Sequence, residues 1–102
     1  MQIAQVRGTV VSTHKANSMT GVKLLLVQFI DEQGQLLPKY EVAADLVGAG
    51  INEWVLVSRG SAARIESRYE ERPLDATIVG IIDTVSVDNR SVYSKRETER
   101  FA

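Results

Sequence analysis

Two segments of this chain carry apolar residues on both faces of a predicted β-strand, and they constrain the fold more than any other feature. In Val22–Ile30 these residues are Leu24, Leu25, Leu26, Val27 and Phe29, and in Ala76–Val85 they are Ile78, Val79, Ile81 and Ile82. Successive side chains of a strand point to opposite faces, so both faces of these strands need cover. In a chain of 102 residues the core covers one face, and we expect another subunit to cover the second.

Three further segments have the pattern of strands. Ile3–Ser12 and Tyr40–Val47 alternate between two faces, and Trp54–Ser58 is a short run of β-branched and aromatic residues. Gly8 is expected to mark a bend or bulge in the first of them. The connecting turns are short: Asp31–Gln35 predicts a hairpin with Gly34 in a left-handed conformation, and Val87–Arg90 leads into a short final strand at Val92–Ser94.

Five main strands, short turns and almost no helical periodicity predict an all-β fold with a single domain over residues 1–102. A five-stranded OB-like barrel, closed or partly closed, is the favoured architecture because closure removes exposed strand edges. A small open sandwich is the alternative. Ser61 is placed to cap one short helical turn through Arg64, Ile65–Arg72 reads as a charged loop, and Glu97–Ala102 belongs to a C-terminal extension.

The charge balance and the absence of cysteine exclude several classes of function. The chain has 12 basic and 13 acidic residues and a net charge of −1, which argues against a nucleic-acid module. Without cysteine it has neither disulfides nor thiolate metal sites. Met1–Val6 alternates and lacks the features of a signal peptide, and no apolar run approaches the length of a membrane span. We expect a cytoplasmic protein that binds neither nucleic acid nor membrane.

No residue stands at a spacing typical of catalysis or of metal binding. His14 is the single histidine, in a polar loop without an orienting partner. Asp83 interrupts an apolar strand. A catalytic acid with a shifted pKa is one interpretation, and an outward-facing or arginine-paired carboxylate is the favoured one. The sequence therefore predicts a protein that is not an enzyme and needs neither a cofactor nor a metal.

Small residues gather in two turns that flank the strand Trp54–Ser58. Gly48, Ala49 and Gly50 precede the strand, and Gly60 and Ser61 follow it. The first turn lacks the third glycine of a dinucleotide motif, and the second lacks the lysine of a phosphate loop. Glycine permits a positive φ or the close approach of another backbone. These turns are expected to position backbone rather than to perform chemistry.

This central segment resembles the CcmL/EutN family of bacterial microcompartment vertex proteins. The resemblance rests on Gly-Ala-Gly at 48–50, Glu-Trp-Val-Leu-Val at 53–57 and Gly-Ser-Ala-Ala-Arg at 60–64. It extends to the first strand, the entry to the second, and the segments Tyr40–Asp45 and Pro73–Val85, while Tyr93–Arg96 resembles the carboxysome branch in particular. Ile65–Arg72 and Glu97–Ala102 depart from the family pattern.

The resemblance implies a barrel that assembles as a homopentamer and closes the vertices of a polyhedral carboxysome shell, which supports carbon dioxide fixation in the cytoplasm. Hexameric carboxysome shell proteins would be its partners. Pore or inter-subunit contacts are then expected among seven residues: Gly48, Ala49, Gly50, Gly60, Ser61, Arg64 and Asp83. An ordinary connecting turn stays an open alternative for each glycine. On fold analogy alone, an OB-type module for nucleic acid or a small ligand is the alternative function.

Overall fold

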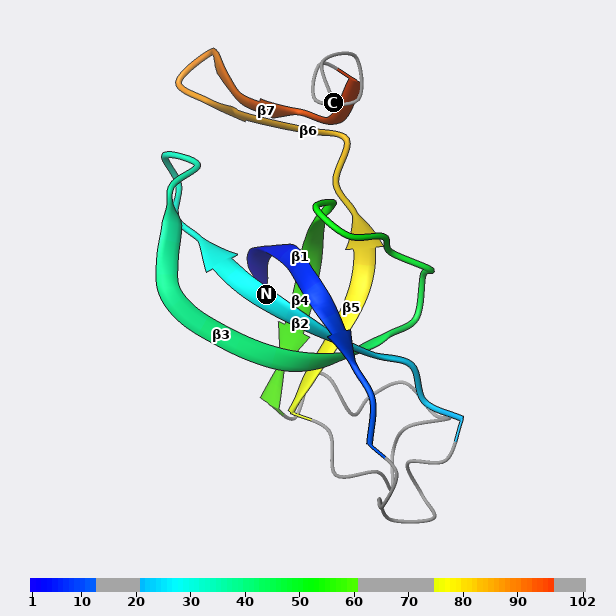
Figure 1. Ribbon diagram of the computed structural model, residues 1–102. Helices are drawn as coiled ribbons and strands as arrows, with labels where there is room; N and C mark the ends of the chain where they lie inside the picture. The colour runs from blue at the N-terminus through cyan, green and yellow to red at the C-terminus, as the bar shows by residue number, and fades with distance from the viewer. Residues whose placement is uncertain (13–20, 61–74, 97–102) are drawn as a thin grey trace.

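The computed structural model describes residues 1–12, 21–60 and 75–96, which form a closed five-stranded barrel and a two-stranded hairpin outside it (Figure 1). The barrel strands are β1 (Gln2–Val10), β2 (Leu24–Ile30), β3 (Leu36–Asp45), β4 (Trp54–Arg59) and β5 (Ala76–Ile81). Their order is β1-β2-β3-β5-β4, antiparallel except for the parallel pair β3–β5. The predicted barrel is confirmed, and the open sandwich is wrong.

Inward side chains of all five strands and of the turn after β3 fill the barrel. Those from the strands include Ala4, Val6, Leu25, Val27, Phe29, Ala43, Val55, Val57, Ala76 and Ile78, and Ala49 comes from the turn. Small alanines from three strands share this core with the ring of Phe29, which is fully buried. One subunit therefore supplies a complete core, and any assembly contact must use the outside of the barrel.

Irregularities in the strand ladders fall at residues that the sequence marks. Arg7 is an extra residue in the β1–β2 ladder, so the bulge predicted at Gly8 is confirmed. Gly34 has a φ of +82°, as the hairpin turn requires. The predicted start of the third strand at Tyr40 is wrong, because β3 begins at Leu36. Pro38 is tolerated inside β3 because it lies in an irregularity of the β2–β3 register, where no ladder hydrogen bond is needed.

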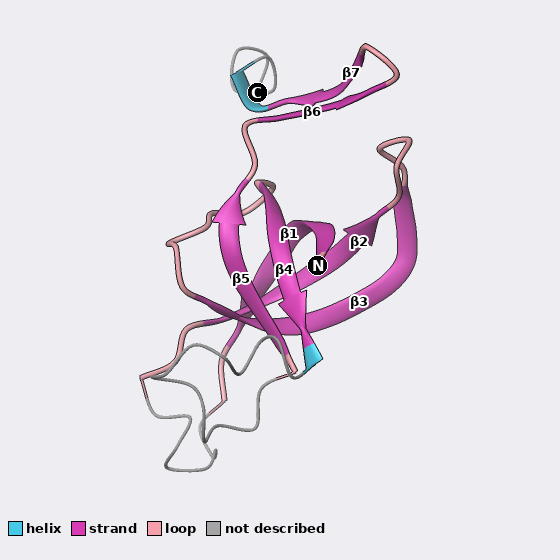
Figure 2. Cartoon of the chain, turned by 180° about the vertical axis from the view of Figure 1, so that it is seen from behind, coloured by secondary structure: helices cyan, strands magenta, loops and turns pink. Residues whose placement is uncertain are grey.

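The predicted continuous strand Ala76–Val85 is also wrong. The Ile82 N–H donates to the carbonyl of Trp54 at 2.8 Å, and the chain then leaves the barrel at the exposed Asp83, whose charge stays in water. Beyond it, β6 (Thr84–Val87) and β7 (Arg90–Ser94) pair with each other and with no barrel strand (Figures 1 and 2). We call this hairpin the arm.

The tip of the arm is a tight turn. Asp88 and Asn89 both have positive φ, 52° and 62°, which fits the two-residue type I′ turn that the twist of a hairpin favours. The predicted helical turn from Ser61 to Arg64 lies outside the described residues. Within the described ranges, no helix is long and apolar enough to cross a membrane.

Candidate functional site

The turn after β3 is built around the buried carboxylate of Asp45. Its Oδ1 accepts the backbone N–H groups of Val47 and Gly48, both at 3.1 Å, and its Oδ2 accepts that of Ala49 at 2.9 Å. A carboxylate that receives several amide hydrogen bonds fixes the backbone that donates them. The Asp45 side chain has 0% of its surface exposed, so the start of this turn is held from inside the barrel.

Lys23 neutralises the charge that Asp45 buries. Its Nζ lies 3.3 Å from Oδ2 of Asp45 and 3.5 Å from the carbonyl oxygen of Ala49, while about half of the lysine side chain stays in water. The two residues are also joined through the backbone, because the Asp45 N–H donates to the Lys23 carbonyl at 2.9 Å. A buried carboxylate needs such partners to remain charged. The pair ties the turn to the start of β2.

A second carboxylate holds the other half of the turn. Oε1 of Glu53 accepts the Gly50 N–H at 2.6 Å. The Asn52 N–H donates to the carbonyl of Val6 at 2.8 Å, and the Val6 N–H donates to the carbonyl of Glu53 at 2.9 Å. Ala49 is buried in the core between these two halves. Nearly every backbone N–H from 47 to 53 thus has a partner, and the segment is a rigid feature rather than a loose loop.

The structure places the predicted glycines at opposite ends of β4. Gly48 has a φ of +78°, whereas Gly50 has no positive φ and is held by its hydrogen bond to Glu53. Gly60 has a φ of +65° and donates its N–H to the Asp75 carbonyl at 2.7 Å. The six residues of β4 separate Gly60 from the first turn. The two turns therefore do not form one site. Ser61 and Arg64 lie outside the described residues.

Asp83 marks the exit from the barrel. Its side chain is exposed, as the outward-facing interpretation predicts, and its carbonyl accepts the N–H of Lys95 at 2.9 Å. Lys95 and Arg96 line the same shallow cleft as Asp83. The described residues contain no group of three or more His, Cys, Asp or Glu that could hold a metal ion. The structure therefore gives Asp83 a place between the barrel and the arm.

The arm is attached to the barrel through an aromatic stack and an ion pair. The rings of Trp54 and Tyr93 are stacked with centroids 4.1 Å apart and planes inclined by 11°. Nζ of Lys95 lies 2.6 Å from Oε2 of Glu53. Stacked aromatic pairs and part-buried charge pairs each contribute stabilising free energy beyond that of the apolar area they bury. The arm thus meets the barrel at the residues that follow the glycine turn.

The ion pair predicts a dependence of stability on pH. The hydrogen bond from Lys95, and then that from the Gly50 N–H, lowers the pKa of Glu53 below its ordinary 4.5. The resulting stability is fully present above the unfolded pKa and is lost as the pH falls through the lowered folded pKa. We expect Glu53→Gln to lose less unfolding free energy than the parent between about pH 6 and about pH 3. Identical acid profiles would contradict this, and Glu32→Gln, at an exposed glutamate, serves as the control.

Gly34 gives a test of the contact between the arm and the β2–β3 turn. A Cβ at Gly34 would lie 2.7 Å from Cγ1 of Val92 in β7, whereas a Cβ at Gly21, whose φ is also +82°, would meet no atom of the described residues within 4 Å. Gly21→Ala should therefore cost about 1 kcal/mol of backbone strain, and Gly34→Ala roughly 1–3 kcal/mol more from the clash with a stiff β-branched side chain. Chemical denaturation measures both, and equal losses would mean that the arm does not rest on this turn.

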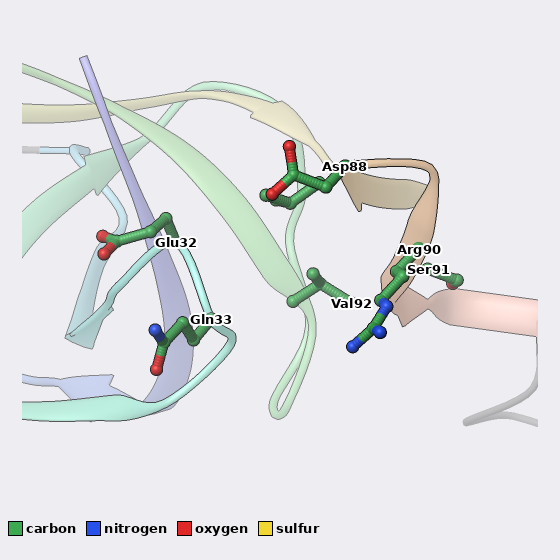
Figure 3. A pocket seen from close by; sticks show the side chains of 7 residues that line it. Glu32, Gln33, Asp88, Arg90, Ser91 and Val92 are labelled. Carbon is green, nitrogen blue, oxygen red and sulfur yellow. The ribbon is translucent and has the colours of Figure 1, made fainter.

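An open cleft separates the tip of the arm from the β2–β3 turn (Figure 3). Its volume is about 660 Å³, and its lining is Glu32, Gln33, Val87, Asp88, Arg90, Ser91 and Val92. Carboxylates lie on both of its sides and a guanidinium on one, and Val87 and Val92 are its apolar lining residues. Small-molecule sites are usually apolar with a few convergent polar groups, so this cleft has the character of a gap between two protein elements.

Four of the exposed large apolar side chains among the described residues belong to β3. Tyr40 and Val42 are 53% and 46% exposed, and they pair with Gln28 and Leu26 of β2 on the same face. Leu36 and Leu37, at the start of β3, are also exposed. We call the outer side chains of Leu26, Tyr40 and Val42 the β2–β3 face. Such a patch on a small protein is typical of a protein–protein contact.

The β2–β3 face only partly fits the prediction made from the two doubly apolar strands. In β2 the inward residues are buried, and the outward Leu24 and Leu26 are half-buried by their neighbours. In β5 the outward Val79 is also partly covered. The more exposed outward apolar side chains therefore lie on β3, where the alternating sequence did not lead us to expect a need for a second cover. Because Phe29 and Tyr93 are buried and Trp54 is stacked, the described aromatic residues offer no row of exposed rings for nucleic-acid bases.

Sequence reasoning missed the residues that organise this region. Asp45 had a local signal, because an aspartate before a Val-Gly-Ala turn can accept N–H groups two to four residues ahead. Glu53, Lys95 and the Trp54–Tyr93 stack had no such signal, since their partners lie about 40 residues away along the chain.

A closed barrel with a braced turn, an outlying arm and an uncovered sheet face defines a protein built to assemble with other protein surfaces.

Comparison with known proteins agrees with this class. The family model for ethanolamine utilisation protein EutN/carboxysome matches residues 1–83, ending where the chain leaves the barrel. The carboxysome shell vertex protein CcmL of Synechococcus elongatus is 66% identical over 97 residues, covering 95% of this chain and 98% of that protein. The solved structure of Gloeobacter violaceus CcmL is 69% identical with a TM-score of 0.90, covering 94% and 99% of the two chains. This chain belongs to the EutN/CcmL family.

The name of a more distant solved structure includes that protein's oligomeric state. GrpN of Rhodospirillum rubrum, described as a pentameric microcompartment shell protein, is 44% identical with a TM-score of 0.78. It covers 87% of this chain and the alignment spans 100% of that protein. The resemblance stated from the sequence motifs is therefore confirmed at the level of the family.

Proposed function

We propose that this chain is a structural vertex protein of the carboxysome shell, which forms pentamers that close the corners of the polyhedron. The observation that carries the proposal is the β2–β3 face, an apolar surface left uncovered by a subunit whose core is already complete. The vertex role and the carboxysome follow the relatives, among them the CcmL of Synechococcus elongatus. The pentamer follows the pentameric shell protein GrpN. No catalytic step is part of this function.

Five-fold symmetry gives such a subunit its function through geometry. A flat sheet of hexamers cannot curve into a closed polyhedron, and pentamers at the corners supply the missing curvature. In a cyclic ring each subunit contacts the next through two different surfaces, so a patch on one must fit a different patch on its neighbour. The β2–β3 face and the arm are two such surfaces, one apolar and fixed on the barrel, the other extended beyond it.

The glycine turn is the candidate for close contact between subunits or around the axis. Gly48 and Gly50 are exposed and carry no side chain, and Asp45 and Glu53 hold the backbone between them. Small exposed residues on a rigid backbone allow five copies to approach one another closely. Hexameric carboxysome shell proteins are the proposed partners of the pentamer's flanks. Gly60, Ser61, Arg64 and Asp83 stay candidate contacts within the same proposal.

Shell assembly with and without this chain tests the proposal. Hexameric carboxysome shell proteins are produced alone, with the parent chain, or with a variant that has lost its oligomeric contact. We expect closed polyhedral particles by electron microscopy only when the parent chain is present, and open sheets or tubes in the other two cases. Closed particles of the same shape without the chain would overturn the vertex function.

A further inference from the structure

The side chain of Glu53 contacts both the glycine turn and the arm. Oε1 accepts the Gly50 N–H at 2.6 Å, and Oε2 lies 2.6 Å from Nζ of Lys95. Its backbone carbonyl also accepts the Val6 N–H of β1 at 2.9 Å. About a fifth of the Glu53 side chain and a quarter of the Lys95 side chain are exposed. The carboxylate therefore joins two features that lie on either side of the barrel exit.

The arm needs such an attachment because it lacks a sheet of its own. It is a two-stranded ribbon, and isolated two-stranded hairpins are marginally stable at best in water. The chain connects it to the barrel through Ile82 and Asp83, and the N–H of Lys95 returns to the Asp83 carbonyl. The direction of the arm is therefore set by side-chain contacts with the barrel, both at its base and where Val92 lies against the β2–β3 turn at Gly34.

Two contact points define a direction that one cannot. The Trp54–Tyr93 stack is one contact between the base of the arm and β4. The Glu53–Lys95 pair lies one residue along the chain from Trp54 and two from Tyr93, and it is a second contact at the base. A strand rises about 3.3 Å per residue, so the tip of a five-residue strand moves by roughly 3 Å when its base turns by about 10°.

We propose that Glu53 is a positioning residue that fixes the direction of the arm relative to the glycine turn, and with it the geometry of subunit association. The partner surface it serves is a second copy of this chain. The effect on association rests on the proposed pentamer, while the effect on the arm does not. The family model ends at residue 83, so Glu53 joins the part of the chain that this model describes to the segment beyond it.

Two variants separate the two contacts of Glu53. In Lys95→Met the carboxylate keeps its bond to Gly50 and loses the arm. In Glu53→Gln the side-chain carbonyl still accepts the Gly50 N–H, while the charge that holds Lys95 is gone. Amide hydrogen exchange of the full chain reports both ends. We expect the amides of β7 and of position 95 to exchange about tenfold faster in each variant, with the Gly50 amide unchanged.

The same samples report on association. Both variants should dissociate at concentrations where the parent remains assembled, and the double variant should be no worse than either, because the two residues act as a pair. Arg96→Met, which removes a neighbouring exposed cation, should leave exchange and association as in the parent. Unchanged β7 exchange in Lys95→Met would overturn the inference. A monomeric parent would overturn the proposed function, and the exchange data would still test the role of Glu53.

Discussion

Replacing Asp45 with alanine is expected to lower the free energy of unfolding by about 3 kcal/mol. The change removes the acceptor of three backbone N–H groups, of which that of Ala49 is fully buried. A buried donor left without a partner costs about 1–3 kcal/mol, and the two part-buried donors add to this. In a domain of this size the melting temperature should fall by about 12 °C or more. Thermal unfolding at matched protein concentration measures the change.

Asp31 supplies a matched control for Asp45. Its Oδ1 also accepts two backbone N–H groups, from Gln33 and Gln35, both at 2.9 Å, but in a turn that water reaches. Asp31→Ala should therefore cost about 1 kcal/mol or less, since water replaces the lost acceptor. A loss as large as that of Asp45→Ala would show that burial of the carboxylate does not decide the effect. It would also remove the reason for treating the glycine turn as braced from inside.

Replacing Val42 with glutamate is expected to abolish the pentamer while leaving the barrel folded. Val42 is half exposed in the single subunit, so a charge there reaches water and should change subunit stability by about 0.5 kcal/mol or less. Buried at an interface next to Leu26, the same charge would lose its hydration without gaining a partner. Sedimentation should show a folded monomer, with a circular dichroism spectrum like that of the parent.

Val11 allows the same substitution away from the β2–β3 face. It is 87% exposed after the end of β1, so Val11→Glu should keep the oligomeric state of the parent. The comparison isolates the position of the new charge, because the residues exchanged are the same. If Val42→Glu assembles as well as Val11→Glu, the β2–β3 face is not the contact between subunits, and another surface must carry the assembly.

The sequence predicts the barrel well because its signals are local. Alternation in Ile3–Ser12, the glycine at position 34 and the bulge at Gly8 each depend on a few neighbouring residues, and each has its predicted place in the structure. The prediction of one strand that continues past Asp83 was wrong for a related reason. Its residues keep a strand pattern on both sides of Ile82, and only the pairing partner changes, from β4 to β7. The periodicity of a strand does not show which other strand it pairs with.

The candidate site divides along the same line. The left-handed glycine at position 48 and the aspartate before it belong to one short segment, so their geometry has a local cause. The link from Glu53 to Lys95 depends on where the arm folds back, which no spacing in the chain records. The need for a second subunit was inferred from β2 and β5, whereas Tyr40 and Val42 on the outside of β3 are the more exposed apolar residues of this sheet face. Only the closed barrel shows which outer positions the neighbouring side chains leave uncovered.

Native mass spectrometry of the full chain tests the central claim most directly. A ring built from the β2–β3 face of one subunit and the arm of the next should survive transfer from micromolar solution as a single species of five copies. The Val42→Glu protein, measured in the same way, should appear as one copy. A parent chain that is monomeric, or that forms a ladder of sizes with no preference for five, would contradict the account.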